Sequence, residues 1–250
     1  MHGGGSIVTT QNGVEFSIII ACLQSYIVVR EQMLHFKNIL NGRHNWEFIL
    51  VDDGSDPPIK PELVDYNFTL FQTHDKRPWT QPCARNFGAK HARGKYFFFT
   101  DIDHIITAEA LDAVERFEGD MIKFKRIYGV LDYFGNIVTN ADILEQYGKK
   151  PDHQSAGEHF NTFAIRREIF EQMKGYDQKF CGKYGGDDTD FMRRYGELHY
   201  ANPDKVARSW QSGIQLYVYP EPKADRKEIF HDIRRKIVAD RRKHVTFRNS

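Results

Sequence analysis

Hydrophobic and polar residues show two different patterns along the first part of the chain: continuous apolar runs and helical spacing. Continuous apolar runs rich in β-branched and aromatic residues are typical of strands that are buried on both faces. Such runs occupy residues 15–22, 46–51 and 95–100, with a shorter strand expected in residues 67–73. Helices are predicted in residues 26–40 and 82–93. This alternation predicts an α/β fold with a mostly parallel central sheet flanked by helices.

The pattern changes beyond residue 109. Strands joined by a turn are expected in residues 119–138, and a strand that runs into a helix in residues 160–177. A glycine-rich loop leads into a further helix in residues 181–197, and residues 214–222 precede a long basic helix. No repeat or linker divides the chain, so we expect one domain over residues 1–250. Its parts are a first half at residues 15–106, a second half at 107–222 and a basic C-terminal helix at 223–250.

Polar residues stand where the predicted parallel strands end. They are Cys22, Asp52, Asp53, Asp101 and Asp103. In sheets of this kind, ligands bind beyond the carboxyl ends of the strands. We therefore expect a binding site along this edge of the sheet.

Asp101 and Asp103 follow an aromatic strand and are two positions apart, so in extended chain their side chains point the same way. Two converging carboxylates suit Mg²⁺ or Mn²⁺, especially an ion that is shared with phosphate oxygens. The plainer alternative is a turn, in which aspartate is common. The preceding apolar strand favours the metal interpretation.

Further polar residues are of types that suit ligand binding or catalysis. Asp53 can accept a hydrogen bond from a nucleotide base or a ribose hydroxyl, and Arg85 can pair with a diphosphate. Asp187 and Asp188 follow two glycines and open a helix, where an ionised carboxylate can act as a general base for a hydroxyl. The structural alternatives are a turn for Asp53, a solvated helix surface for Arg85 and a helix cap for the aspartate pair.

Charge excludes a polyanion-binding role for the molecule as a whole, because the formal net charge is +1. The tail is different, since residues 223–248 carry ten Lys or Arg against four Asp or Glu. This excess allows an anionic partner such as a membrane surface or nucleic acid, whereas a solvated amphipathic helix is the simpler interpretation.

Cysteine usage and hydropathy bear on the compartment. Cys22, Cys83 and Cys181 are widely and irregularly spaced, which fits neither a disulfide framework nor a zinc site and suggests a reducing compartment. No apolar run is long enough to span a bilayer, and no signal peptide is recognisable. We expect a cytoplasmic protein that its basic tail can bring to the periphery of a membrane.

Four sequence blocks, taken in order, carry a family resemblance. They are FSIIIACLQSY, FILVDDGSD, ARNFGAKHARGKYFFFTDIDH and GYDQKFCGKYGGDDTDFMRR, within about residues 15–195. This ordered set resembles the GT-A-fold glycosyltransferases of family 2. The resemblance implies a Rossmann-like GT-A sheet with a C-terminal acceptor-side half. It also implies transfer of a hexose from a nucleotide diphosphate donor, with a UDP-sugar as the first candidate, with inversion and with Mn²⁺ or Mg²⁺ as cofactor.

The resemblance also implies roles for the donor-binding residues. Ala21, Cys22 and Gln24 would line the nucleotide pocket, where the family commonly has Pro, Thr or Ser, and Asn. Asp53 would meet the base, and Arg85 the nucleotide or its phosphates. Asn161, at the start of the strand that leads to the acceptor side, would complete the nucleotide-sugar site.

Metal and catalytic roles follow from the same resemblance. Asp101 would lie near the ribose and the metal, and Asp103 would ligate the metal directly as the second aspartate of a DxD motif. His231 would supply a further metal ligand, ahead of His104 and His244. Asp188 would be the catalytic base, with Asp187 at a position where the family usually has Glu.

Two alternatives belong to other functional classes. A nucleotidyltransferase would explain the acids at the strand ends but would leave Asp187 and Asp188 without a role, and it would release pyrophosphate. A catalytically silent module would bind a nucleotide, or a polyanion through the basic tail. The residues do not distinguish a glycan acceptor from a lipid-linked or other hydroxyl acceptor.

Overall fold

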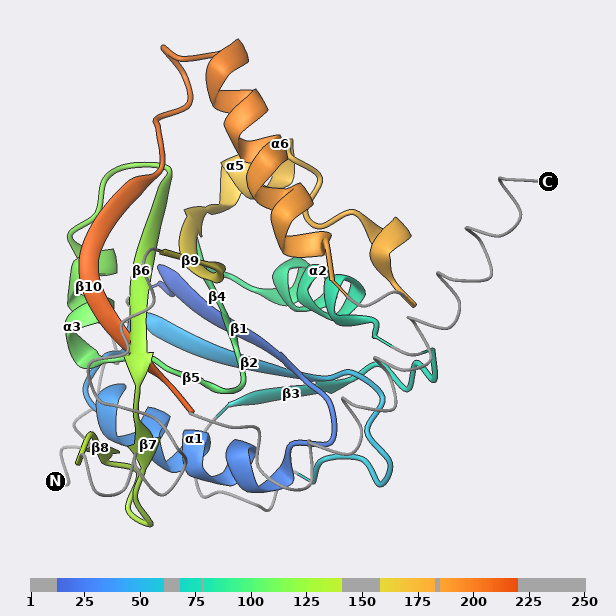
Figure 1. The fold of residues 1–250 in the computed structure, drawn as a ribbon, viewed down its shortest axis with the longest axis vertical. Helices are drawn as coiled ribbons and strands as arrows, with labels where there is room; N and C mark the ends of the chain where they lie inside the picture. Colours follow the sequence, from blue (N-terminus) through green and yellow to red (C-terminus); the bar gives the residue numbers. More distant parts are fainter. Residues whose placement is uncertain (1–12, 61–67, 78, 141–157, 183–184, 220–250) are drawn as a thin grey trace, which may run out of the picture.

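The computed structural model describes residues 13–60, 68–77, 79–140, 158–182 and 185–219. Its main sheet has eight strands in the order β3-β2-β1-β4-β9-β6-β10-β5 (Figure 1). The strands are β1 Phe16–Cys22, β2 Trp46–Asp52, β3 Thr69–Gln72, β4 Tyr96–Asp101, β5 His104–Ile105, β6 Met121–Tyr128, β9 Glu158–Arg166 and β10 Trp210–Val218. A small hairpin consists of β7 Val130–Leu131 and β8 Ile137–Val138.

Strand direction decides which residues meet at the edge where β1 and β4 end. The strands β3, β2, β1 and β4 are parallel neighbours. β9 is antiparallel to both β4 and β6, so β6 again points the same way as β4, and β10 is parallel to β6. The carboxyl ends of β1, β2, β4 and β6 and the beginning of β9 therefore lie at one edge of the sheet.

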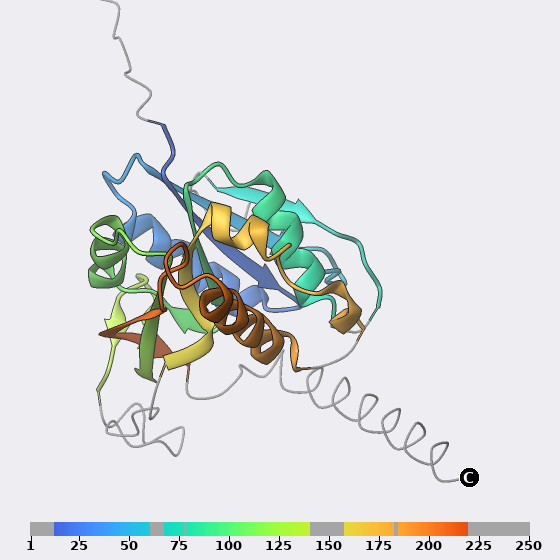
Figure 2. The same cartoon turned by 90° about the horizontal axis from the view of Figure 1, so that it is seen from above.

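Helices cover both faces of the sheet, as Figures 1 and 2 show. Their bounds are α1 Tyr26–Ile39, α2 Gln81–His91, α3 Ala108–Glu115, α5 Arg167–Gln172 and α6 Asp187–Ala201, with a 3₁₀ turn η2 at Gln178–Phe180. Buried residues of α1 and α3 pack in one core cluster, and those of α2, α5 and α6 in the other. The sheet is thus a buried layer between two layers of helices.

The aromatic strand β4 shows why continuous apolar runs suit this position. Successive side chains of a strand point to opposite faces. Phe98 lies in the core cluster beneath α1 and α3, whereas Phe97 and Phe99 lie in the cluster beneath α2, α5 and α6. All three are at most 1% exposed, and burial of each contributes about 1.5–3 kcal/mol to stability. These contacts fix the strand whose end carries Asp101.

Helix α2 lies unusually close to the sheet because it has a glycine at the contact. A Cβ atom placed on Gly88 would lie 2.6 Å from Cγ2 of Ile19 and 3.1 Å from Cγ2 of Val51. The absence of a side chain therefore allows the helix to approach β1 and β2. Arg85 lies one turn earlier on the same buried face of α2.

The predicted α/β architecture is confirmed. The four apolar runs predicted as strands in the first part of the chain correspond to β1, β2, β3 and β4, and the two predicted helices correspond to α1 and α2. In the second part, β6 to β8, β9 followed by α5, the helix α6 and the strand β10 also lie where the sequence predicts them. The local hydrophobic period is sufficient to find these elements because the sheet is buried on both faces.

The prediction that the cysteines form no disulfide is wrong. Cys83 of α2 is bonded to Cys181, which follows η2, across a sequence separation of 98 residues, while Cys22 is free and buried. The two partners are distant in sequence and adjacent in the fold, so their spacing carried no signal. The cysteines therefore no longer indicate a reducing compartment.

Several sequence predictions lie outside the described residues. These are the basic helix at residues 223–250 and the histidines His231 and His244 within it. Within the described ranges, every helix is too short or too polar to cross a lipid bilayer.

Candidate active site

A cavity of about 360 Å³ opens at the edge of the sheet where β1, β2 and β4 end. Its walls come from segments that are far apart in the sequence, including the beginnings of β9 and α6. Most residues that the sequence singles out line this cavity: Ala21, Cys22, Asp53, Asp101, Asp103, Asn161, Asp187 and Asp188. The fold therefore gathers three separate acidic groups around one space.

Asp53 lies on the cavity wall directly after β2. Its backbone N–H donates to the carbonyl of Cys22 (2.8 Å), which joins the ends of β2 and β1. The Thr80 hydroxyl donates to Oδ1 of Asp53 (2.5 Å). Burial raises the pKa of Asp53 to about 7, although the Thr80 hydrogen bond acts in the opposite direction. A carboxyl group that titrates near neutral pH can either accept or donate a hydrogen bond.

Asp52 has a different task from its neighbour. Its carboxylate accepts hydrogen bonds from the backbone N–H groups of Ser55 (2.9 Å) and Ile59 (2.8 Å). Asp52 therefore closes the loop after β2, as expected for an aspartate in a turn.

Asp101 stands at the end of β4 in a dense hydrogen-bond network. Its Oδ1 accepts from Nη2 of Arg85 (2.6 Å) and Nε2 of Gln81 (2.8 Å), and its Oδ2 accepts from Nδ2 of Asn161 (3.2 Å). Burial alone would raise the pKa of Asp101, but the charge of Arg85 and the other partners outweigh it, so the pKa lies below its usual range. Asp101 is therefore a carboxylate at neutral pH.

Arg85 lies beneath the cavity and does not line it. Its side chain is fully buried, and its guanidinium contacts Asp101, Asn161 and the hydroxyl of Tyr176 (3.3 Å) while lying over the Tyr176 ring. In the structure Arg85 forms an ion pair with Asp101, as a buried carboxylate needs a nearby cation; its predicted contact with the nucleotide stays a prediction. Arg85 holds Asp101 in place from below.

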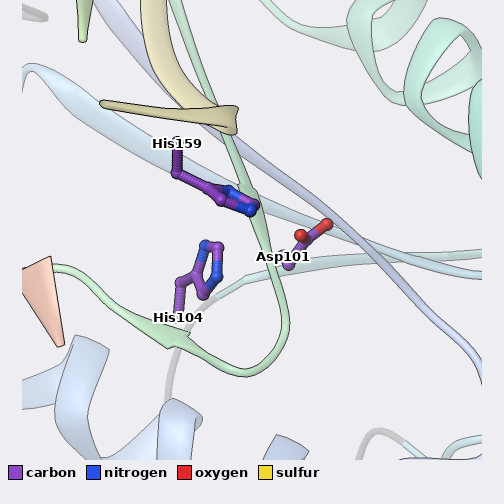
Figure 3. A group of neighbouring side chains, drawn as sticks. All are labelled: Asp101, His104 and His159. Atoms are coloured by element: carbon purple, nitrogen blue, oxygen red, sulfur yellow. The ribbon is translucent and has the colours of Figure 1, made fainter. Parts of the chain in front are cut away.

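Two histidines adjoin Asp101. One ligand atom each of Asp101, His104 and His159 lie within 4.8 Å of one another, and Figure 3 shows the ring of His159 above that of His104, with the Asp101 carboxylate beside them. Nδ1 of His104 contacts Oγ1 of Thr162 (2.5 Å), and its Nε2 lies 3.3 Å from Nη1 of Arg126. Burial lowers the pKa of His104, and it lowers that of His159 to about 3. Both rings are therefore neutral at pH 7.

This end of the cavity is chemically suited to a divalent cation. Asp101 offers oxygen atoms, and the neutral rings of His104 and His159 offer nitrogen close to it, a set that suits Mn²⁺. Asp103 lines the same cavity but is not part of this converging group. Nε2 of His104 accepts a hydrogen bond from Arg126, and Nδ1 of His159 accepts one from the N–H of Asn161, both at 3.3 Å. The donor set therefore fits the metal that the DxD pattern implies.

Asp187 and Asp188 begin α6. Gly186 precedes them with φ of +93°, a left-handed conformation that favours glycine. Asp187 is 3% exposed, and burial raises its pKa; its Oδ2 has no hydrogen-bond partner in the described part of the chain. Asp188 is half-buried and accepts a hydrogen bond at Oδ1 from the N–H of Thr189 (2.7 Å). The pair thus presents one orphaned buried oxygen and one accessible carboxylate.

Gln24 is the remaining predicted residue of the described chain, and it does not line the cavity. Its backbone N–H donates to Oγ of Ser55 (2.9 Å), which ties the β1 end to the loop after β2. Its contribution to the site is therefore to the shape of the wall.

Several residues that line the cavity were not predicted from the sequence. They include Gln81 at the start of α2, His159 on β9 and Arg126 on β6. His159 had a signal, because it lies two positions before Asn161 and a strand places both on one side. Arg126 had none, since nothing local reveals that β6 ends at the same edge of the sheet as β4.

Comparison with known structures defines the fold of the protein. The mannosyltransferase PcManGT from Pyrobaculum calidifontis, solved with GDP-Man and Mn²⁺, matches with a TM-score of 0.57 at 16% identity, over 85% of this chain and 59% of that one. TarS from S. aureus matches with a TM-score of 0.52 at 17% identity, over 88% of this chain and 39% of that one.

A shorter form of TarS, residues 1–349 in complex with UDP, matches with a TM-score of 0.50 at 16% identity, over 88% of this chain and 64% of that one. This chain thus spans less than two thirds of each of these proteins. Together they show that the fold is that of the GT-A glycosyltransferases.

The family follows from the sequence itself. The model of "Glycosyl transferase family 2" matches residues 17–174, which is more than half of the chain. The chain therefore belongs to glycosyl transferase family 2. No curated protein matches it significantly.

Proposed function

We propose that this protein is a glycosyltransferase that moves a sugar from a nucleotide diphosphate donor to an acceptor hydroxyl, with a divalent cation and with inversion at the anomeric carbon. One observation carries the proposal. A single cavity is lined by Asp53 after β2, by Asp101 and Asp103 after β4, and by Asp187 and Asp188 at the start of α6. We assign the nucleoside contact to Asp53, the contact with the diphosphate and its metal to Asp101 and Asp103, and the base to Asp188 of the last pair.

The nucleoside would occupy the end of the cavity near β1 and β2. Ala21 and Cys22 form its wall, and Asp53 offers a carboxyl group that titrates near neutral pH for a hydrogen bond to the base. The similar proteins described above were solved with GDP-Man and with UDP. Both bases are therefore the first to test, with UDP preferred from the sequence resemblance.

The diphosphate would lie above the end of β4. Asp103 and Asp101 would hold the cation, with His159 within reach, and Arg85 fixes Asp101 from below. A cation bound there would neutralise the negative charge that develops on the departing nucleoside diphosphate. Arg85 cannot take this role itself, because its charge is buried and committed to Asp101.

Asp188 would act as the base. Its Oδ1 is held by the N–H of Thr189, and its carboxylate lines the cavity. It would take the acceptor hydroxyl proton while the hydroxyl oxygen forms a bond to the anomeric carbon and the bond to the diphosphate breaks on the opposite face. Asp187, with its unpartnered Oδ2, would accept a hydrogen bond from a substrate hydroxyl.

Calorimetric titration tests the donor site. UDP and GDP are titrated into the protein with and without Mn²⁺, and into Asp103→Ala. We expect one nucleotide to bind only with Mn²⁺, and to lose at least about tenfold in affinity in the variant, which corresponds to about 1.4 kcal/mol. The matched control is Asp204→Ala, which removes an exposed acid from the loop that follows α6. If neither UDP nor GDP binds, the proposal is contradicted.

The products separate glycosyl transfer from nucleotidyl transfer. With a nucleotide sugar and Mn²⁺, we expect release of free nucleoside diphosphate, slowly to water or faster with an acceptor. Release of pyrophosphate from a nucleoside triphosphate and a sugar phosphate would instead favour the nucleotidyltransferase alternative.

A further inference from the structure

Arg126 is a cation at the cavity that the proposed mechanism does not use. It lies near the carboxyl end of β6, is half-buried and lines the cavity. In the sheet, β9 separates β6 from β4, so the two strands are roughly 10 Å apart. Arg126 therefore lies beyond the end of β4 in the direction away from Asp53.

Among the described residues, the charge of Arg126 has no carboxylate counterpart. Among the described residues that line the cavity, it is the one with a permanent positive charge, and no carboxylate of the described chain forms an ion pair with it. Its hydrogen bond goes to Nε2 of His104 (3.3 Å). A guanidinium has five N–H donors, so most of them remain for a ligand. These donors suit a carboxylate or phosphate, which a guanidinium can bind through two parallel hydrogen bonds.

The surrounding side chains hold Arg126 in position. Because Nε2 of His104 accepts from Arg126, the proton of the neutral ring is on Nδ1, which donates to Oγ1 of Thr162 (2.5 Å). Thr162 is itself buried and lies 3.3 Å from the hydroxyl of Thr100. These contacts connect buried Thr100 and Thr162 through His104 to the guanidinium of Arg126. The guanidinium is therefore oriented in the absence of a ligand.

We propose that Arg126 forms an anion-recognition subsite for a carboxylate or phosphate group on the part of the substrate beyond the donor diphosphate. This inference rests on the proposed function, which puts the nucleoside near Asp53 and the diphosphate above Asp101 and Asp103. The anionic group belongs to the donor sugar, as in a uronic acid, or to the acceptor, as in a phosphorylated sugar. The chemistry is the same in both cases, and the experiment distinguishes the two sources.

The donor arm compares nucleotide sugars that differ in a single carboxylate. UDP, UDP-glucose and UDP-glucuronate, and likewise GDP, GDP-mannose and GDP-mannuronate, are titrated with Mn²⁺ into the wild type. The acceptor arm titrates glucose and glucose 6-phosphate into the protein saturated with the nucleotide that binds. In one of these arms we expect the anionic member to bind at least about tenfold more tightly than its neutral counterpart, a factor that equals about 1.4 kcal/mol.

The variants assign the preference to Arg126. Arg126→Gln should abolish it, Arg126→Lys should keep part of it, and Lys125→Gln should leave it unchanged. Lys125 is the matched control because it is the adjacent cation on β6 and is exposed. Melting temperatures of all variants verify folding, and binding of the plain nucleoside diphosphate should be the same in Arg126→Gln as in the wild type.

Each other outcome contradicts a specific statement. If no arm shows a preference for the anion, or if the preference survives in Arg126→Gln, the subsite does not exist. If Arg126→Gln weakens plain UDP or GDP as much as the charged sugar, Arg126 serves the diphosphate and the assignment is wrong. If the wild type binds no nucleotide at all, the proposed function fails, and the subsite fails with it.

Discussion

At the scale of single residues, neighbouring aspartates of this protein have different tasks. Asp52 closes a loop through two backbone N–H groups, whereas Asp53 next to it faces the cavity. Asp187 is buried with an unpartnered oxygen, whereas Asp188 is accessible. Because adjacent residues leave a strand end or helix start in different directions, the two acids of each pair have different surroundings and can have different roles.

Asp188→Asn tests the proposed base. The amide keeps the shape of the side chain but cannot take a proton, so we expect transfer to fall by about 10²–10⁴-fold while donor affinity is unchanged. Single-turnover transfer and calorimetric donor binding measure the two quantities. Asp204→Asn is the control, and an active Asp188→Asn enzyme would exclude this residue as the base.

The titration of Asp53 predicts a dependence of stability on pH. Burial raises its pKa to about 7 in the folded protein, against about 3.9 in the unfolded chain. Between these values the folded state holds a proton that the unfolded state has lost, so the contribution of Asp53 to stability is present below about pH 4 and is lost as the pH rises to about 7. The size of the loss is on the order of a few kcal/mol.

Urea unfolding of wild type and Asp53→Asn from pH 4 to 8 measures this effect. Relative to Asp53→Asn, the wild type should lose free energy of unfolding as the pH rises to about 7. Above that pH the difference between the two proteins should stay constant. Other titrating groups are common to both proteins and cancel. A difference that does not vary with pH would contradict the raised pKa.

At the scale of elements, helix α2 controls the position of Arg85. The helix approaches β1 and β2 closely at Gly88, and this approach lets the buried Arg85 reach Asp101 at the end of β4. Residues of one helix thereby fix a carboxylate on a neighbouring strand.

Gly88→Ala tests this packing. Its Cβ would lie 2.6 Å from Ile19, so α2 has to shift, and we expect a loss of about 1–3 kcal/mol of stability together with weaker donor binding. Gly196→Ala is the matched control, because Gly196 lies within α6 with no atom within 4 Å of an added Cβ. There the substitution should raise stability by up to about 1 kcal/mol. Equal effects of the two changes on thermal unfolding would contradict the close approach of α2.

At the scale of the whole molecule, the cavity draws on both halves of the chain. Asp53, Asp101 and Asp103 belong to residues 15–106, whereas Asn161, Asp187 and Asp188 belong to residues 107–222. The disulfide between Cys83 and Cys181 and the hydrogen bond from Gly182 to the carbonyl of Trp79 (2.8 Å) join the halves close to the start of α6. These connections hold the proposed base over the proposed donor site.

Removal of the disulfide should affect both stability and transfer. The Cys83→Ser/Cys181→Ser protein should lose about 2–4 kcal/mol of unfolding free energy and should transfer severalfold more slowly, because Asp188 is positioned less firmly, while donor affinity changes little. Unfolding and transfer are measured with and without dithiothreitol. The reductant should reproduce the loss in the wild type and leave the double variant unchanged; a wild type that is insensitive to reduction would contradict the prediction.

Much of the fold and part of the site could be predicted from the sequence. The apolar runs of β1, β2 and β4 and the acids that follow them are local patterns, and strands buried on both faces leave a clear signal. The contact partner of Arg85, the presence of His159 beside Asp101 and the disulfide could not be predicted in this way. Each depends on residues that are distant in the sequence.

The sequence by itself therefore determined the α/β architecture, the acidic edge of the sheet and the family. Only the tertiary structure decided that β9 runs against its neighbours, which brings His159 and Asn161 to Asp101 and returns β6 with Arg126 to the same edge. The physical reason is that hydrophobic period and strand-end chemistry act over a few residues, whereas strand order and direction are set by packing across the whole sheet.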